Sequence, residues 1–386
     1  MALLGLSLLL GVAPVAATQS AQGPEIRFHG LLLVNGFHNS ARVNNSDVPT
    51  FVLPPDTATR PLPESALGAS VRQTRVWITA AVADFHGAAL TGELDTDFFG
   101  GQQPSTGGRT HPVLRIRRVF AEIRWPSVSL LVGQEAPPLF EVSPSTLASS
   151  GLPGFASAGN LWLWLPQIRL TGWLTPGSSL RIGLEGTVLA PSAGEPQDPF
   201  LTQPDRAERS DRPALEGRVV AHWGDGATAG DVGLGGHLGW LALPGDSLVE
   251  SQALGASARI PLGSRVELRG EVFTGQALAG LGGGGIGQNI SPAGEAVDSK
   301  GGWGQLILKL GREHEIGVGY GMDDPEDSDL TAAGRFRNTA FAAHLMFRFL
   351  PALVALEYRL LETRYSTPGP GDRRNHHLNL AAGFEF

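Results

Sequence analysis

The chain has 386 residues, 52 of them glycine, with no cysteine, a net charge of −8 at pH 7 and a mean hydropathy close to zero. The absence of cysteine excludes disulfides and thiolate metal sites, and the acidic balance argues against nucleic-acid binding, which needs a basic surface. Beyond the extreme N-terminus, no run of about 18 apolar residues occurs. This argues against transmembrane helices, but not against a membrane protein built from strands.

Residues 1–17 are predicted to be a secretory signal peptide. Residues 3–12 form a short apolar core, and Val15-Ala16-Ala17 offers small residues for cleavage. No lysine or arginine precedes Arg27, so either the recorded start lies too far downstream or the signal is unusual. The alternative is an N-terminal anchor helix, but about ten apolar residues are too few to span a bilayer of about 30 Å. We therefore expect export, with 18–386 forming one domain.

Alternation of apolar and polar residues indicates strands with two unlike faces, and it recurs sixteen times after the signal. Most of these segments are about 9–13 residues long, which suits tilted strands that cross hydrocarbon. An even number is also what single-chain bacterial barrels have. The predicted strands are 26–35, 71–83, 88–98, 113–124, 127–134, 166–175, 179–189, 214–223, 230–242, 250–260, 264–274, 302–310, 313–321, 336–349, 352–364 and 375–386.

The connections between these strands alternate between short and long. Short links contain His86-Gly87, Pro126, Pro176-Gly177, Gly224-Asp225-Gly226, Pro261-Leu262-Gly263, Gly311-Arg312 and Leu350-Pro351. The long links are 36–70, 99–112, 135–165, 190–213, 275–301, 322–335 and 365–374, and only 243–249 is brief. Transmembrane barrels have short periplasmic turns and longer outer loops. The sequence therefore predicts an all-β fold, an antiparallel up-and-down transmembrane β-barrel of about 16 strands with both mature termini in the periplasm.

Charged residues share one side of most predicted strands. On 88–98, Glu93, Asp95 and Asp97 alternate with apolar Leu90 and Leu94. A basic residue facing lipid at mid-membrane costs about 2–4 kcal/mol, and unpaired charge in a dry core is costly too, so the interior is expected to be wet. The predicted pore-lining residues are Arg75, Glu93, Asp95, Asp97, Arg115, Arg117, Arg169, Arg181, Glu185, Arg218, Arg259, Arg265, Glu267, Arg269, Glu271, Arg348, Glu357 and Arg359, and Glu216 and Lys309 share the polar side.

The segment 113–124 departs from the pattern. Arg118 falls on the side of Leu114 and Ile116, opposite Arg115 and Arg117. Either a β-bulge resets the register here, or this outer surface contacts a neighbouring subunit.

The long link 135–165 is rich in Pro, Ser and Gly and carries Glu135 and Glu141. A loop of this length without secondary structure is uncommon unless it is functional. Our hypothesis is that it bends into the barrel and narrows the bore, with Glu135 and Glu141 at the constriction. The alternative is an external lid on neighbouring loops. The Leu-Trp-Leu-Trp-Leu run at 161–165 is either a buried anchor for this loop or part of an aromatic girdle.

The last eleven residues carry the clearest alternation. Leu378, Leu380, Ala382, Phe384 and Phe386 occupy one side, and small or polar residues occupy the other. A terminal phenylalanine is typical of bacterial outer-membrane barrels, so Phe386 is expected to be an assembly signal for the barrel assembly machinery.

Several short segments carry a family resemblance. They are Glu93-Leu94-Asp95-Thr96-Asp97-Phe98, Leu114-Arg115-Ile116-Arg117, Val132-Gly133-Gln134, Gly302-Trp303-Gly304-Gln305-Leu306, Gly319-Tyr320-Gly321-Met322-Asp323-Asp324-Pro325, Glu357-Tyr358-Arg359 and Phe386. Through these segments the chain resembles the trimeric outer-membrane porins, most nearly the DcaP-like and phosphate-selective branches. The likeness implies a homotrimer of sixteen-stranded barrels in an outer membrane of the Gram-negative type, with the third outer loop folded inward. The N-terminal coiled coil of some DcaP-like porins has no counterpart here.

The favoured function is a water-filled channel for passive diffusion of small hydrophilic solutes, selective through its width and its fixed charges. The predicted wall is modestly basic and the loops hold the acidic excess, which favours anions. Expected partners are outer-membrane lipid and lipopolysaccharide. A substrate-specific channel and a surface-contact protein remain alternatives.

A barrel enzyme is the alternative from another class, although we expect no enzymatic activity. An enzyme needs a nucleophile activated by a positioned base, and the strand histidines His29, His222, His237, His344 and His377 do not reveal one in sequence. No cofactor or metal site is predicted. The acidic stretch 323–329 either holds a divalent cation through hard oxygen ligands or is simply solvated.

Overall fold

The computed structural model describes residues 23–101, 111–175, 177, 179–195, 203–366 and 371–386, so the signal peptide predicted at 1–17 lies outside the described residues. The described chain is almost entirely strand and loop. Its strands are β1 (Glu25–Asn39), β2 (Ala66–Ser70), β3 (Arg75–Phe85), β4 (Ala88–Asp97), β5 (Arg115–Arg124), β6 (Val128–Glu135), β7 (Leu165–Leu174), β8 (Leu180–Leu189), β9 (Ala214–Trp223), β10 (Gly230–Ala242), β11 (Leu248–Leu262), β12 (Val266–Gln276), β13 (Asp298–Leu310), β14 (His314–Pro325), β15 (Arg335–Phe349), β16 (Ala352–Tyr365) and β17 (Asp372–Glu385).

Short 3-10 turns lie in the loops: η2 (Pro138–Phe140), η3 (Glu208–Ser210), η4 (Gly226–Thr228), η5 (Ala279–Leu281), η6 (Gly284–Gly287) and η7 (Asp327–Asp329). In the described part of the chain, no helix is long and apolar enough to cross a membrane.

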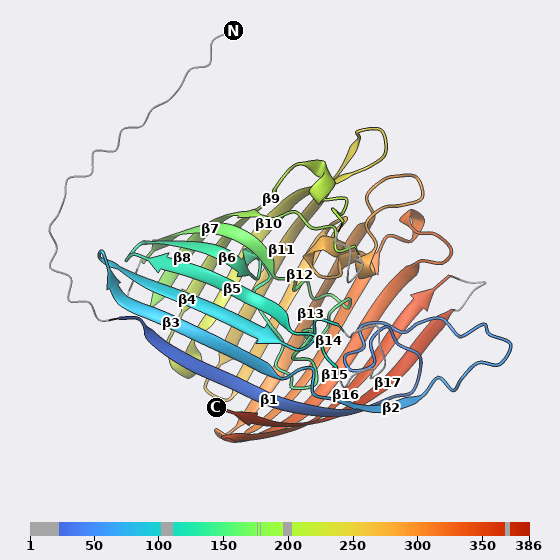
Figure 1. Cartoon of the computed structure of the whole chain (residues 1–386), viewed down its shortest axis with the longest axis horizontal. Coiled ribbons are helices and arrows are strands. Elements are labelled where there is room, and N and C mark those ends of the chain that lie inside the picture. The colour runs from blue at the N-terminus through green and yellow to red at the C-terminus, as the bar shows by residue number, and fades with distance from the viewer. Residues whose placement is uncertain (1–22, 102–110, 176, 178, 196–202, 367–370) are drawn as a thin grey trace, which may run out of the picture.

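The strands form one antiparallel sheet that closes on itself (Figure 1). From β3 onward, each strand pairs with the next strand in the chain, and β17 pairs with β1 from Leu31↔Glu385 to Asn39↔His377. β2 and β3 both pair with β1 and together make one crossing of the wall. The barrel therefore has sixteen wall crossings, as predicted, and closure leaves no open strand edge.

The end of the chain completes the seam between β17 and β1. Phe386 N donates to Gly30 O at 3.0 Å, and Gly30 N donates to Phe386 O at 2.9 Å. The Phe386 ring covers Gly30, where a Cβ would lie 2.4 Å from the ring, so a larger residue there would displace the ring. The role of Phe386 as an assembly signal stays a prediction.

The predicted strand bounds agree with the observed ones within a few residues except at 71–83. Residues 71–74 form a break between β2 and β3, where Thr74 N donates to Val71 O at 3.0 Å. The break lets Arg72 donate to Asp47 of the first loop at 2.9 Å and Gln73 donate to Ala148 O of the third loop at 3.0 Å. The predicted strand 71–83 is therefore interrupted at 71–74 because these residues bind the first and third loops. The alternation of apolar and polar residues carries no information about such contacts.

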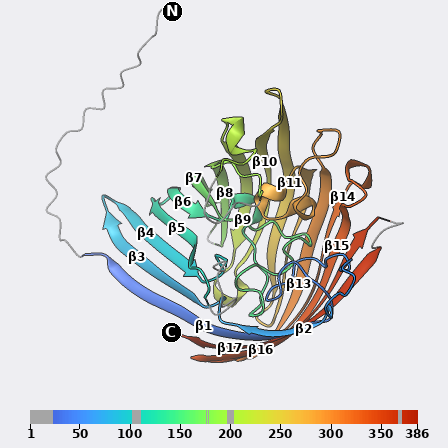
Figure 2. The same ribbon diagram turned by 45° about the vertical axis from the view of Figure 1, so that its right-hand side comes forward.

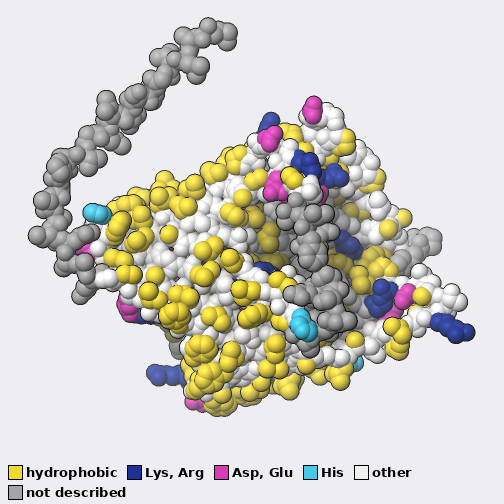
Figure 3. Space-filling view, in the orientation of Figure 1, with side chains coloured by type: hydrophobic (Ala, Val, Ile, Leu, Met, Phe, Trp, Pro, Cys, Tyr) yellow, Lys and Arg dark blue, Asp and Glu magenta, His cyan; other side chains and the backbone are white. Residues whose placement is uncertain are grey.

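The two faces of the wall differ as the alternation predicts. On β12, Leu268 and Val272 are 43 % and 60 % exposed on the outer face, whereas Glu267 and Glu271 are 7 % and 2 % exposed inside. Hydrophobic side chains cover the outside of β3–β9, and charged side chains gather at the end that carries the longer loops (Figure 3). Such an outer face suits hydrocarbon.

A β-bulge at Arg117 accounts for the irregular segment 113–124. The pairing of β4 with β5 jumps from Asp95↔Arg118 to Thr96↔Ile116, which leaves Arg117 without a direct partner. An extra residue reverses the facing of the residues after it. Arg117 and Arg118 therefore both face inward, and the structure supports the bulge among the two sequence alternatives.

The glycine of the Val132-Gly133-Gln134 segment lies next to the bulge. Gly133 adopts a φ of 140°, and a Cβ there would lie 2.2 Å from Val119 O. Only glycine fits both constraints, so the tight approach of β6 to the bulged strand explains this residue.

An arginine introduced on the outer face tests which side meets lipid. Val272→Arg is expected to lower the free energy of unfolding by about 2–4 kcal/mol when the barrel is folded into vesicles, because the new charge faces hydrocarbon. Urea titration of folding, followed by tryptophan fluorescence, measures the effect. Val272→Ala controls for the lost side chain, and equal stability of the two variants would contradict a lipid-facing wall.

Candidate functional site: the bore and its third loop

The third loop, residues 136–164, lies inside the barrel and reaches the wall at several strands (Figure 2). Near its start, Leu139 N donates to Glu216 on β9 at 3.2 Å. Further on, Ser145 N donates to Gln305 on β13 at 2.8 Å. Beyond its tip, Gly151 O accepts from Arg115 on β5 at 2.6 Å. The loop thus crosses the bore and returns.

Glu141 anchors the first half of this loop. Its carboxylate accepts hydrogen bonds from Arg169 on β7 and from Arg218 on β9, the latter at 2.7 Å. Burial alone would raise the pKa of Glu141, but the two guanidinium groups outweigh burial and hold that pKa below its usual value. Glu141 is therefore ionised at neutral pH and cross-links the loop to two strands.

Glu357 on β16 anchors the tip of the loop. Its carboxylate accepts from Thr146 Oγ1 at 2.6 Å, from Leu147 N at 2.6 Å and from Ala148 N at 2.8 Å. Hydrogen bonds that a carboxylate accepts are of the stronger kind. A wall carboxylate thus satisfies main-chain donors that the tip leaves unpaired.

A ladder of alternating charges covers the inside of β3–β5. Arg75 pairs with Asp95 at 2.6 Å, and Arg115 pairs with Asp97 at 2.6 Å. Arg117 bridges towards both carboxylates, at 3.5 Å from Asp95 and 3.0 Å from Asp97. The bulge allows this arrangement, because it adds one more inward guanidinium to the row.

The ladder continues through a residue that the sequence did not assign to the interior. Arg118 forms ion pairs with Glu93, with Asp95 at 3.3 Å and with Glu135 at 3.0 Å. Predicted as a constriction-loop residue, Glu135 is the last residue of β6 and part of this ladder. Arg118 faces inward only because the β-bulge changes which residues of this strand point into the barrel. The sequence alone does not show at which residue a bulge occurs.

The opposite wall carries basic side chains near the short-turn end. Arg259 pairs with Asp231 at 2.9 Å, and Lys309 pairs with Glu267 at 2.8 Å. Arg181 and Arg348 have no ionic partner among the residues that the structure describes, although Arg181 lies 4.3 Å from the Trp173 ring. Positive charge on this side of the bore is therefore only partly compensated, since Arg348 acts on Glu315 without a close ion pair.

The predicted lining residues do not all meet open space. Most lie on the inner face of their strands, but Arg265 is in the turn before β12. Glu271, Glu357 and Arg359 face inward and are buried, at 2 %, 6 % and 6 % exposure. Glu271 accepts from Trp303 Nε1 at 2.9 Å, and Arg359 donates to Ser149 Oγ of the third loop. These three residues support the loop instead of contacting solvent.

Neutral amides line the seam and were absent from the predicted set. Asn35 donates to Asn379 Oδ1 at 3.1 Å and to Leu147 O of the third loop at 3.1 Å. Asn375 donates to Asn39 Oδ1 at 3.0 Å. The alternation in the sequence already put these asparagines on the inward side of their strands. Because they carry no charge, the sequence did not distinguish them from polar residues that merely contact water.

The first loop also enters the barrel. Pro49 O accepts from Arg359 at 3.4 Å, and Thr50 O accepts from Asn338 at 2.8 Å. Tyr365 donates to Val52 O at 2.7 Å. The first loop makes these contacts through its backbone carbonyls, which every residue type has. Its position inside the barrel could therefore not be predicted from its side chains.

The tryptophan run at 161–165 is an internal anchor and not an outer girdle. Leu161 and Leu165 are 1 % and 6 % exposed and belong to a core with Leu139 and Phe140. Trp164 lies under Arg117, whose Cζ is 4.4 Å from the ring centroid. The run therefore fixes the returning end of the third loop.

A serine, a carboxylate and a histidine meet inside the barrel, but in an order that does not activate a nucleophile. Ser145 Oγ donates to Glu315, and His344 Nε2 lies 3.1 Å from the same carboxylate. A nucleophilic serine needs its hydroxyl bonded to the base. Here the acid separates serine from histidine, so the cluster is a loop anchor.

The acidic stretch 323–329 does not converge on a cation site. Asp323 points inward and accepts from Ser299 at 2.7 Å. Asp324 pairs with Arg337 at 2.7 Å, and Asp327 pairs with Arg364 at 2.7 Å. Across the described ranges, no group of three His, Cys, Asp or Glu side chains could hold a metal ion.

No protein-family model matches the chain, and no curated protein matches it either. Solved structures do match. The outer membrane channel DcaP of Acinetobacter baumannii gives a TM-score of 0.68 at 14 % identity, covering 96 % of this chain and 100 % of that chain. An anion-selective porin from Comamonas acidovorans gives 0.61 at 12 % identity, covering 94 % and 100 %.

A third match is the trimer form of in-vitro folded OmpT, an outer membrane protein of Vibrio cholerae. It gives a TM-score of 0.53 at 10 % identity, covering 95 % of this chain and 100 % of that chain. At these identities the likeness establishes a shared fold. The chain therefore has the porin-type sixteen-stranded barrel that its sequence resemblance implied.

Proposed function

We propose that this protein is an outer-membrane channel through which small hydrophilic solutes diffuse passively, with a preference for anions. The observation that carries the proposal is a closed wall, apolar outside and charged inside, with a loop held across its bore by wall residues. Selectivity in such a bore comes from its width and its fixed charges. No bond making is required of any residue.

The preference for anions is supported by an exposure difference within the ion pairs of the lining. Arg115 is 22 % exposed and Asp97 0 %, Arg259 is 44 % exposed and Asp231 11 %, and Lys309 is 35 % exposed and Glu267 9 %. Water in the bore thus contacts the basic member of each pair, while the acidic member lies behind it. Glu141, Glu185 and Glu315 are exceptions, since each is more exposed than the basic side chain that it contacts.

The third loop supplies the proposed constriction. Glu141, Ser145 and the residues that Glu357 holds lie across the bore, so a solute passes between this loop and the basic side chains of the opposite wall. Opposed charges stand side by side in the lining, as in the pairs Arg75–Asp95 and Arg115–Asp97, and such pairs produce a transverse field. Such a field favours polar over apolar solutes.

Placement and assembly belong to the same proposal. The outer-membrane location follows from the apolar outer wall and from the porins that share the fold, with residues 1–17 as a cleaved export signal. A homotrimer is proposed because one protein of this fold was solved in a trimer form.

Ion current across a planar lipid film tests the channel directly. Purified folded protein is expected to produce discrete current steps, and the same chain kept unfolded in urea is expected to produce none. Insertion is checked separately by protease protection in vesicles. A protein that inserts fully and gives no current would reject the channel.

A further inference from the structure

Two aromatic rings meet on the inner wall near the short turns, where β7 and β9 end and β8 begins. Trp173 of β7 faces inward and pairs with Gly183 of β8. A Cβ on Gly183 would lie 3.0 Å from Trp173 Cζ3, so the glycine lets the indole lie close against the wall. The His222 ring of β9 stands 5.5 Å from the Trp173 ring, centroid to centroid, and is tilted by 48° to it. The two rings therefore form an apolar corner among charged side chains.

Arg181 completes this aromatic corner. Its Cζ lies 4.3 Å over the Trp173 ring, and its direct cross-strand partner is His222. The Arg181 side chain is exposed, and within the part of the chain that the structure describes it makes no ion pair or hydrogen bond. Contact with the indole restrains the guanidinium while its N–H donors stay free. The corner thus offers donors for an anion directly beside two rings.

The charges along the same row of cross-strand partners favour a solute with one negative group. The row runs from Arg181 through His222 and Asp231 to Arg259, across three strand spacings or roughly 15 Å. Arg259 is held by Asp231 at 2.9 Å. A single benzene ring is too short to bridge the two arginines, so a second carboxylate at its far end would lie over His222 or Asp231 instead of on a cation.

We propose that Trp173, Arg181 and His222 bind a small aromatic monocarboxylate on its way through the bore. The carboxylate accepts two hydrogen bonds from the forked guanidinium of Arg181. The solute ring packs against His222 and the part of the Trp173 ring that Arg181 leaves uncovered, in the tilted or offset arrangement that aromatic pairs prefer. The inference rests on the proposed channel, and it adds a preference for flat aromatic anions to the general preference for anions.

Block of the ion current by added solutes tests the site. The full chain in a planar lipid film conducts chloride, and benzoate, cyclohexanecarboxylate or neutral benzamide is added to both sides. The two acids carry the same charge and differ mainly in the flat π-system, so the ratio of their half-blocking concentrations isolates the aromatic contact. Benzoate is expected to block at about fivefold lower concentration, the ratio given by about 1 kcal/mol for an aromatic pair. Benzamide should block less than either acid.

Substitutions separate the two parts of the site. Trp173→Leu is expected to bring the ratio of the two acids near one, and Trp173→Phe should keep part of the preference for benzoate. His222→Leu removes the other ring and should also lower the ratio, which keeps the test available if Trp173→Leu does not fold. Arg181→Gln is expected to raise both half-blocking concentrations about tenfold, because hydrogen bonds to a charged group are lost.

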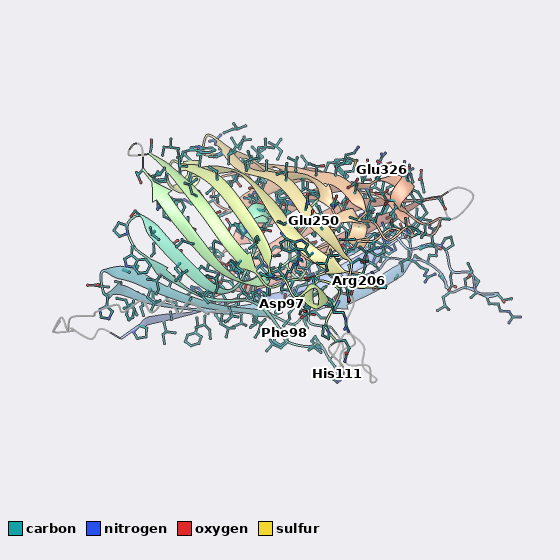
Figure 4. The ribbon with its side chains drawn as sticks, turned by 90° about the horizontal axis from the view of Figure 1, so that it is seen from above. Asp97, Phe98, His111, Arg206, Glu250 and Glu326 are labelled. Atoms are coloured by element: carbon teal, nitrogen blue, oxygen red, sulfur yellow. The ribbon has the colours of Figure 1, made fainter. Side chains whose placement is uncertain are left out.

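A second arginine–tryptophan contact supplies the matched control. Arg212 Cζ lies 5.2 Å over the Trp240 ring, but Trp240 is on the outer side of β10. Trp240 pairs with Glu250, which lies toward the long-loop end of the barrel (Figure 4). Trp240→Leu and Arg212→Gln should both keep the wild-type ratio of the two acids.

Three results would overturn the site: equal block of the wild type by the two acids, an unchanged ratio in folded Trp173→Leu, or stronger block by terephthalate than by benzoate. The chloride current of the wild type, recorded in the same films before any acid is added, distinguishes the two possible failures. A conducting barrel without a preference for benzoate rejects this inference alone, and a barrel that inserts without conducting rejects the channel.

Discussion

Replacing Glu141 with glutamine is expected to release the first half of the third loop and to cost about 3 kcal/mol of stability. Removing one member of a buried ion pair leaves the other charges uncompensated, and Arg218 and Arg169 are 2 % and 8 % exposed in their side chains. This expected loss of stability lies at the lower end of the range of about 3–5 kcal/mol for breaking a buried ion pair, because the Glu141 side chain is 33 % exposed. Protease cleavage within 136–164 should accelerate, and single-channel current should become larger and noisier.

The same carboxylate gives this loop a defined acid response. Because the folded-state pKa of Glu141 is lowered, its contribution to stability is complete above the ordinary carboxyl range and disappears as pH falls through the lowered pKa. The rate of protease cleavage in the wild-type loop should therefore rise only in strong acid. In the Glu141→Gln variant the cleavage rate should depend less on pH, because the variant lacks the carboxylate whose protonation releases the loop. Glu250→Gln, at the exposed outer rim of β11, controls for loss of a negative charge. A loop that stays equally protected in both variants would show that Glu141 does not hold it.

Residue alternation predicted the wall because each crossing of a barrel must present one apolar and one polar face. The strands β4, β9 and β10 therefore begin and end at or within one residue of their predicted positions. The pattern failed at 71–74, where inward Arg72 and Gln73 interrupt the strand to meet two loops. It also left open the register at Arg117, since a bulge depends on the neighbouring strands and not on local preference.

The sequence predicted which charged residues point into the barrel, but it did not predict which loop residues they contact. Parity placed Glu271, Glu357 and Arg359 on the inner face, but it gave no sign that loops cover them. The anchors of the third loop are wall carboxylates that accept main-chain N–H groups, as at Leu147 and Ala148. Any loop residue offers such a donor, so the sequence does not record which one is used.

Reversing the charge of Arg181 and Arg348 is expected to convert the bore from anion-preferring to cation-preferring. Neither of these two inward arginines forms a close ion pair among the described residues, although Arg348 lies within electrostatic reach of Glu315, so a passing ion feels most of their charge. One unit charge at about 4 Å in water contributes about 1 kcal/mol, roughly fivefold in the relative permeability of anions and cations. The double variant Arg181→Glu/Arg348→Glu changes four units, which is enough to move the reversal potential in a salt gradient through zero.

The measurement also separates this effect from a general change in net charge. Arg60→Glu alters an exposed residue of the first loop, and the reversal potential should stay at the wild-type value. Because the Debye length is about 10 Å at 0.1 M salt and about 3 Å at 1 M, the shift in the double variant should shrink as salt rises. If the double variant keeps the wild-type reversal potential at 0.1 M, then the paired arginines of the ladder, and not Arg181 and Arg348, set the selectivity. That result would move the selective region from the short-turn end of the bore to the level of Arg115 and Asp97.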